Sequence, residues 1–174
     1  MESKAKIFGH AIHPILIVFP LGLLATAVIF DIIYLATGNH TWTLVSFYMI
    51  AAGIIGGLVA ALFGFIDYIY IPWGTRAKRV GIYHAVVNVV AIVLFILSLV
   101  WRWSVPDTPA TPALLLSFAG VLLALVGGWF GGELVERLGM SVSANASLNA
   151  PSSLSKEDRV HEPDVRHHNL RPSH

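Results

Sequence analysis

The chain alternates between long apolar runs and short polar breaks. An α-helix rises about 1.5 Å per residue, so about 20 residues cross the hydrocarbon core of a bilayer. Four runs have this length, and they predict helices over about residues 12–36, 42–70, 81–103 and 112–132. The breaks between them contain residues that end helices, among them Gly38, Pro72 and Pro106. The pattern predicts an all-α polytopic membrane protein with four transmembrane helices in an antiparallel bundle.

The composition agrees with this pattern. Of the 174 residues, 56% are hydrophobic and only 12% are charged, whereas soluble domains carry about 25% charged residues. The net charge of +1 and the lack of a long basic block argue against nucleic acid as a partner. The chain has no cysteine, which excludes disulfides and thiolate metal sites. It also has no nucleophile or phosphate-loop motif, so the sequence gives no sign of an independent enzymatic activity.

Lysine and arginine predict the orientation of the helices, because short positively charged loops stay in the cytoplasm. With four spans, the N-terminus, the loop between the second and third helices and the C-terminus share one side. That side holds most of the basic residues near the spans: Lys4, Lys6, Arg76, Lys78, Arg79 and Arg137. The opposite side holds Arg102. We therefore expect both termini in the cytoplasm, with residues 1–139 as the transmembrane domain and the polar residues 140–174 as a disordered cytoplasmic tail.

Small residues predict how the helices pack. In lipid, helices approach closely where glycine and alanine share one face. Gly53, Gly57, Ala60 and Gly64 form such a face on the second predicted helix, and the same spacing places Asp67 toward the bundle interior. A second glycine-rich face follows the fourth predicted helix.

The first predicted helix contains a proline in its interior. Pro20 removes one helical hydrogen bond and frees the carbonyl of Leu16. We therefore expect a kink at this point.

Polar side chains from three predicted helices approach one layer of the membrane. His10 and His13 begin the first helix, Asp67 lies near the end of the second, and His84 and Asn88 share one face of the third. At the helical rise, His13, Asp67 and His84 lie within about one turn of a common depth near the cytoplasmic surface. Ionisable groups in a span cost about 2.5–3.5 kcal/mol at mid-helix, so each needs a partner or a function.

Several chemical interpretations of this cluster remain open. Two imidazoles can ligate haem b axially, with Arg79 and its basic neighbours available for the propionates. His13, Asp67 and His84 can instead hold a divalent metal, or the histidines and Asp67 can form a proton relay. The cluster can also be purely structural, with His10 and His13 anchoring a helix end and Asp67 paired with His84 or Arg79.

These interpretations correspond to different functions. The leading hypothesis is a small redox-associated subunit that binds haem or passes electrons to a partner. The alternatives are an ion or metal permease and a purely structural or assembly subunit, and a homo-oligomer is compatible with each.

Asp31 belongs to a separate site, in the outer half of the first predicted helix. We expect it to pair with Arg102 or His40 rather than to serve transport.

The motifs of the chain resemble those of a bacterial family. Gly9-His10-Ala11-Ile12-His13-Pro14, followed by Phe19-Pro20 and Asp31, is similar to the opening of the membrane family called domain of unknown function 2231. Asp67 after Gly64, and His84-Ala85-Val86-Val87-Asn88, resemble its later motifs, so the likeness extends over about residues 7–135. One position departs from the pattern: Val18 stands where the family usually has a third histidine before Phe-Pro.

The resemblance implies a multi-pass protein of the bacterial cytoplasmic (inner) membrane, with four helices and no established activity. Members of the family are sometimes fused or adjacent to Rieske-type iron–sulfur domains. This association favours the redox hypothesis and a Rieske-type redox partner.

Overall fold

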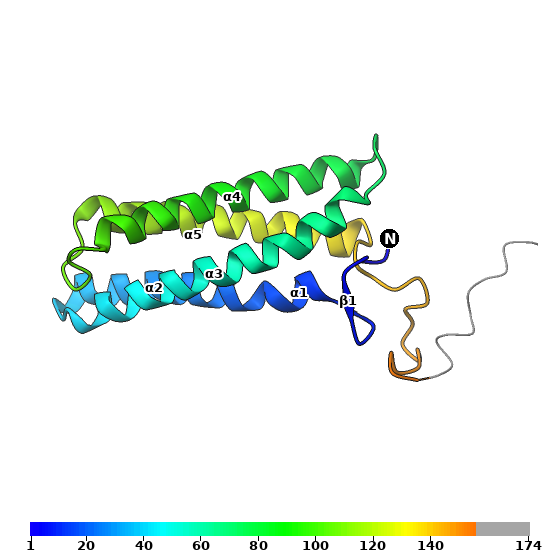
Figure 1. The fold of residues 1–174 in the computed structure, drawn as a ribbon, viewed down its shortest axis with the longest axis horizontal. Helices are drawn as coiled ribbons and strands as arrows, with labels where there is room; N and C mark the ends of the chain where they lie inside the picture. The colour runs from blue at the N-terminus through cyan, green and yellow to red at the C-terminus, as the bar shows by residue number, and fades with distance from the viewer. Residues whose placement is uncertain (156–174) are drawn as a thin grey trace, which may run out of the picture.

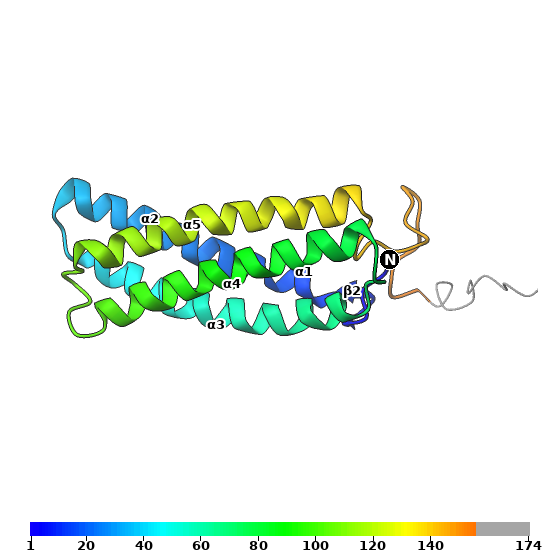
Figure 2. The same ribbon diagram turned by 90° about the horizontal axis from the view of Figure 1, so that it is seen from above.

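The computed structural model describes residues 1–155 and shows an elongated antiparallel bundle of helices (Figures 1 and 2). The helices are α1 (Ile12–Leu16), α2 (Val18–Thr37), α3 (Thr41–Ile69), α4 (Arg76–Arg102) and α5 (Thr111–Gly132), and a π-helical turn, η1 (Glu133–Arg137), extends α5. Within the described residues, four helical segments are long and apolar enough to cross a membrane: Ile12–Thr37, Thr41–Ile69, Arg76–Arg102 and Thr111–Arg137. The predicted fold class is confirmed.

The outside of the bundle is apolar, as a lipid-facing surface requires. Large hydrophobic side chains point outward along the helices, among them Leu62, Phe65, Val89, Leu97 and Leu122. A continuous apolar surface of this kind marks contact with lipid rather than with water.

The third span begins earlier than the sequence analysis predicted. α4 starts at Arg76 instead of about Gly81, because the hydroxyl of Thr75 accepts a hydrogen bond from the backbone N–H of Lys78 at 3.1 Å and so caps the helix. The ammonium of Lys78 donates to the carbonyl oxygen of Tyr68 at 2.8 Å and lies 3.9 Å from the centre of the Tyr68 ring. These contacts give the buried ammonium of Lys78, in the first turn of the helix, a hydrogen-bond acceptor and an aromatic face.

The first span is interrupted close to the place where the sequence predicts a kink. α1 ends at Leu16 and α2 begins at Val18, so Ile17 separates two helical pieces. Pro20 has no N–H to donate to the carbonyl of Leu16, the residue at which α1 ends.

The helices pack most extensively as two pairs, α2 with α3 and α4 with α5. The middle of the bundle holds an apolar core, made of Leu24, Ala27, Val28, Ile50, Ile54 and Phe95. Side chains of neighbouring helices pack closely against glycines of this core. A Cβ added at Gly53 would lie 2.7 Å from Leu24, and one added at Gly120 would lie 2.9 Å from the ring of Phe95. The predicted small-residue faces therefore bring helices together by accommodating side chains of the neighbouring helix.

A buried ion pair joins the two helix pairs near one end. Arg102 of α4 donates two hydrogen bonds to the carboxylate of Asp31 on α2, at 2.8 and 2.6 Å, and both residues are fully buried. Ser117 of α5 donates to the same carboxylate at 3.0 Å, and the Nε of Arg102 donates to the hydroxyl of Ser98 at 3.2 Å. The predicted pairing of Asp31 is confirmed, with Arg102 as the partner.

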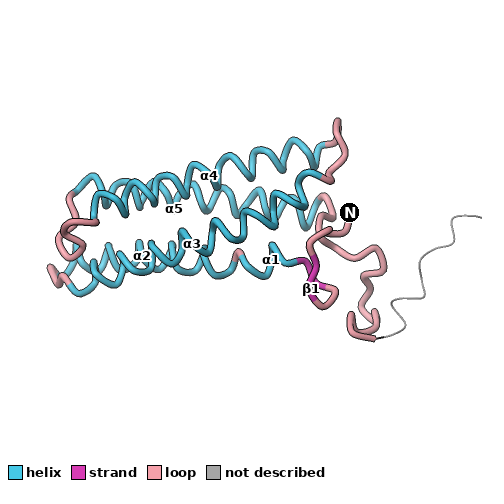
Figure 3. The backbone as a smooth tube through the Cα atoms, viewed as in Figure 1, coloured by secondary structure: helices cyan, strands magenta, loops and turns pink. Residues whose placement is uncertain are grey.

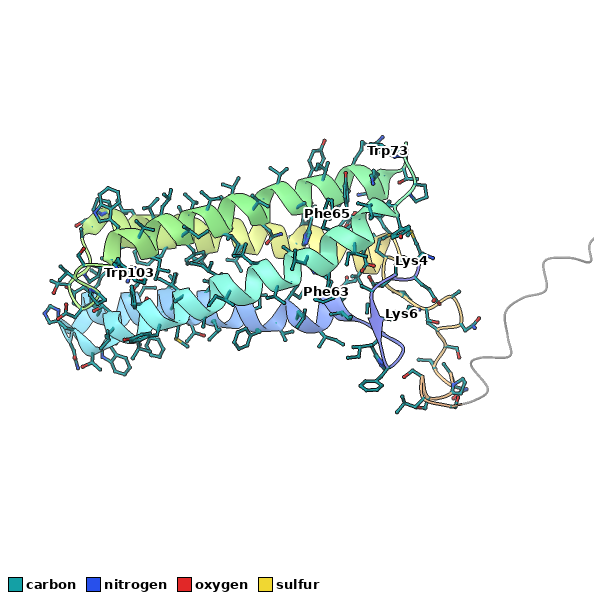
Figure 4. The ribbon with its side chains drawn as sticks, viewed as in Figure 1. Lys4, Lys6, Phe63, Phe65, Trp73 and Trp103 are labelled. Carbon is teal, nitrogen blue, oxygen red and sulfur yellow. The ribbon has the colours of Figure 1, made fainter. Side chains whose placement is uncertain are left out.

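The opposite end of the bundle, which we call the basic end, carries the N-terminus and the loop between α3 and α4. Figure 4 shows Lys4, Lys6 and Trp73 at this end and Trp103 at the other. The strands β1 (Lys6–Ile7) and β2 (His10–Ala11) form a small antiparallel hairpin here, which the sequence analysis did not predict (Figure 3).

The first part of the predicted tail also lies at the basic end. Residues 141–155 form turns and irregular segments, and the amide of Ala144 donates to the Glu2 carboxylate at 2.9 Å. Residues 156–174 lie outside the described part of the chain, so disorder of the tail stays a prediction.

The ion pair yields a prediction about stability. Arg102→Met leaves the carboxylate of Asp31 buried without its partner, and we expect the free energy of unfolding to fall by about 3–5 kcal/mol. The double variant Asp31→Leu/Arg102→Met removes both charges and is expected to recover most of this loss. Thermal unfolding of both variants and of the unchanged protein in the same detergent measures the two changes in stability. Equal destabilisation by the single and the double variant would contradict the prediction.

Candidate functional site

His13 lies against α3 at the basic end. Its Nδ1 is 2.8 Å from the carbonyl oxygen of Ala60, and its ring lies over Gly64, where a Cβ would be 2.9 Å from the imidazole. A carbonyl oxygen can only accept, so Nδ1 carries the hydrogen. The small-residue face of α3 thus holds the imidazole in place.

His84 is held in the same way by the other helix pair. Its Nδ1 is 2.9 Å from the carbonyl oxygen of Gly127 on α5, so this nitrogen also carries the hydrogen. Asn88, one turn deeper on α4, donates to the carbonyl oxygen of His84 at 2.7 Å and fills the space that Gly127 leaves open. The predicted shared face of His84 and Asn88 is therefore present.

The two imidazoles are neighbours. The ring centres of His13 and His84 are 6.1 Å apart and their planes are nearly perpendicular, at 88°. Both residues are half-buried. Because each Nδ1 donates to a backbone carbonyl, each Nε2 keeps its lone pair, and within residues 1–155 neither Nε2 takes part in a hydrogen bond. We call these two residues the imidazole pair.

Asp67 has a different partner from the one that the sequence analysis considered. Its carboxylate accepts hydrogen bonds from the hydroxyl of Ser3 at 2.8 and 2.7 Å, from the amide of Lys4 at 2.8 Å and from the amide of Ala5 at 3.4 Å. The expected pairing with His84 or Arg79 is absent from residues 1–155. Asp67 instead holds the N-terminal segment, residues 1–11, against α3.

The remaining candidates lie apart from the imidazole pair. His10 is exposed, with its Nδ1 3.1 Å from the carbonyl oxygen of Phe8, and Arg79 is exposed on the surface of α4. Within residues 1–155, no group of three His, Asp or Glu side chains is placed to hold a metal ion. A metal site at His13, Asp67 and His84 stays a prediction.

A second set of contacts links the N-terminal segment to the residues after η1. The Glu2 carboxylate pairs with Lys6 and accepts a hydrogen bond from the amide of Ala144. The hydrogen bond from Lys6, the Ala144 amide and the Ser143 side chain lower the pKa of Glu2 to about 2. These contacts lie outside the spans and fix the segment that leads into α1.

Sequence reasoning missed Ser3 and Ser117. Ser3 contributes chiefly through its position beside Asp67, which no local pattern encodes. Ser117 lies in an apolar run as an isolated hydroxyl, and such residues in spans often bond across helices. That signal could have pointed to Ser117 as a partner of the Asp31 carboxylate.

The anchoring by Asp67 can be tested by proteolysis. Asp67→Ala removes the acceptor for the backbone of Lys4 and Ala5, and hydrogen bonds to a charged group contribute about 1.5–3 kcal/mol each. We expect tryptic cleavage after Lys4 and Lys6 to accelerate by about tenfold or more, because the N-terminal segment opens more often. Asp107→Ala, which removes an exposed carboxylate at the opposite end, is the matched control. Equal cleavage rates for the two variants would contradict the anchoring role.

Comparison with known proteins supplies the family. Searches of the curated proteins and of the solved structures found no match to this chain. A family model described as "Predicted membrane protein (DUF2231)" matches residues 9–144, which include the imidazole pair, Asp67 and the ion pair. The chain therefore belongs to this family of multi-pass membrane proteins.

Proposed function

We propose that this protein is a membrane subunit whose imidazole pair ligates one transition-metal centre. The supporting observation is the state of the four ring nitrogens. Each Nδ1–H donates to a backbone carbonyl on a different helix, and each Nε2 keeps a free lone pair. Metal-ligating histidines typically donate their other N–H to a carbonyl or carboxylate, which fixes the tautomer and the ring orientation.

The number of protein ligands favours haem iron over a free ion. Structural zinc sites use four protein ligands and catalytic sites use three, whereas the imidazole pair offers two. A haem brings four nitrogens of its own and needs only axial ligands from the protein. When bound, it would supply one-electron redox chemistry, and His13 and His84 would hold it.

The two imidazoles are close neighbours. Metal–nitrogen bonds are about 2.0–2.1 Å long, so two histidines that ligate one metal must lie close together. The ring centres of His13 and His84 are 6.1 Å apart. Both residues are only half-buried, so neither is sealed inside the bundle.

The layered interior argues against transport of ions through the bundle. On α4, Phe95 lies seven residues from Asn88 and seven residues from Arg102, which is about 10 Å along the helix in each direction. The apolar core around Phe95 therefore separates these two polar residues. A permeation path would need polar groups across this layer, and the core there is apolar. The imidazole pair is thus better suited to a local ligand than to a pathway.

The charge distribution supports an orientation with the basic end in the cytoplasm. Lys4, Lys6, Arg76 and Arg79 lie at that end, and short basic loops remain on the cytoplasmic side. In the bacterial inner membrane, His13 and His84 would then lie near the cytoplasmic surface, where a redox partner could reach the site.

An absorption spectrum of the protein purified from haem-replete cells tests this proposal. We expect a Soret band that is lost or shifted in His84→Ala and in His13→Ala, and unchanged in His10→Ala, the matched control on an exposed histidine. Elemental analysis distinguishes the source of the metal, since iron without a Soret band, or another metal, indicates a free ion. Colourless, metal-free protein would refute the proposal.

A second prediction uses the glycine under His13. Gly64→Ala places a methyl group 2.9 Å from the imidazole, so the ring must move and the site is distorted. We expect the affinity for the ligand, measured by spectroscopic titration, to fall about tenfold. Gly128→Ala, where a Cβ meets nothing within 4 Å, is expected to leave the affinity unchanged. Equal affinities for the two variants would show that the His13 ring position does not control binding.

A further inference from the structure

The hairpin at the basic end has an unusual turn. Ile7 and His10 pair across it, and the two residues between them, Phe8 and Gly9, have positive φ angles of 49° and 83°. Two-residue turns with both φ angles positive strongly favour Asn-Gly or Asp-Gly. A phenylalanine at the first turn position costs conformational energy, and such strain persists where the surroundings impose it or a function uses it.

The surroundings hold the backbone of this turn but leave the aromatic ring outside. The carbonyl oxygen of Phe8 accepts a hydrogen bond from the hydroxyl of Ser153 at 3.0 Å, and Nδ1 of His10 is 3.1 Å from the same oxygen. Yet the Phe8 residue is 76% exposed and its neighbour Ile7 is 49% exposed. The turn therefore presents two apolar side chains at a fixed position without burying either.

The position of the hairpin indicates what covers these side chains. The hairpin projects sideways from the basic end, across the long axis of the bundle (Figures 1 and 3). Lys4 and Lys6 lie at this end, as does Trp73, an exposed tryptophan of the kind that marks headgroup depth (Figure 4). Because the bundle axis crosses the membrane, a sideways projection at this depth runs along the membrane surface.

We propose that the N-terminal hairpin is an interfacial anchor that binds the lipid headgroup layer at the basic end. Ile7 and Phe8 insert at the boundary between headgroups and acyl chains. Lys4, which forms no ion pair within residues 1–155, contacts anionic headgroups, so apolar burial and electrostatic attraction act together, as they do in interfacial amphipathic segments. This inference does not depend on the ligand of the imidazole pair.

The absence of cysteine makes the proposal directly testable by single-site spin labelling. A nitroxide label is attached at Ile7→Cys in two proteins, one that keeps Phe8 and one that carries Phe8→Asn. Both proteins are placed in nanodiscs of phosphatidylcholine alone and of phosphatidylcholine with an equal amount of phosphatidylglycerol. Asparagine suits the turn better than phenylalanine, so the hairpin is kept while the apolar tip is lost. The relaxation of the label by oxygen and by a water-soluble nickel chelate reports its depth.

In the protein that keeps Phe8, we expect the label to be more accessible to oxygen than to the nickel chelate. This preference for oxygen should be larger when phosphatidylglycerol is present. With Phe8→Asn this preference should fall at least severalfold. A label at Leu148→Cys, a fully exposed site after η1, provides the aqueous reference. Nickel accessibility at Ile7→Cys equal to that reference, or no effect of Phe8→Asn, would overturn the proposal. Shielding from both reagents would also overturn it, because it would indicate contact with a second protein copy.

Discussion

Arg102 and Asp31 carry opposite charges inside an apolar bundle, and their meeting restricts how the two helix pairs can be arranged. α2 packs on α3 and α4 packs on α5, so the ion pair between α2 and α4 crosses from one helix pair to the other. A slip of one helical turn would separate the charges and leave each in a medium where an unpaired ion costs several kcal/mol. The same restriction sets the register at the basic end, where His13 and His84 come from the same two helix pairs.

Glycine has a second role in this register. The glycines of α3 and α5 receive particular side chains, with the His13 ring over Gly64 and Asn88 over Gly127. A methyl group at either position would displace a polar side chain rather than a lipid-facing one. The close packing that lipid-exposed helices need thus also creates the space in which the imidazoles are fixed.

The sequence predicts most of this architecture. It does not predict the contacts between residues that are far apart along the chain. Apolar run length predicts four spans, Pro20 predicts the break in the first span, and depth counting predicts that His13 and His84 approach each other. The early start of α4 was missed because the Thr75 cap and the carbonyl of Tyr68 satisfy Lys78. The partners of Asp67 were missed because backbone amides of a short polar segment leave no pattern in the sequence.

Those amides connect the N-terminal segment to the imidazole pair. Asp67 accepts from the amide of Ala5, the carbonyl of Ala5 accepts from the amide of Ile12 at 2.9 Å, and His13 is the next residue. The chain just before His13 is therefore connected to Asp67 of α3 through Ala5, and the His13 ring is fixed to α3 by the carbonyl of Ala60. His84 is fixed independently to α5. Each imidazole thus belongs to a different helix pair, so any ligand held by both Nε2 atoms would also stabilise the contact between the two pairs at the basic end, as the ion pair does at the other.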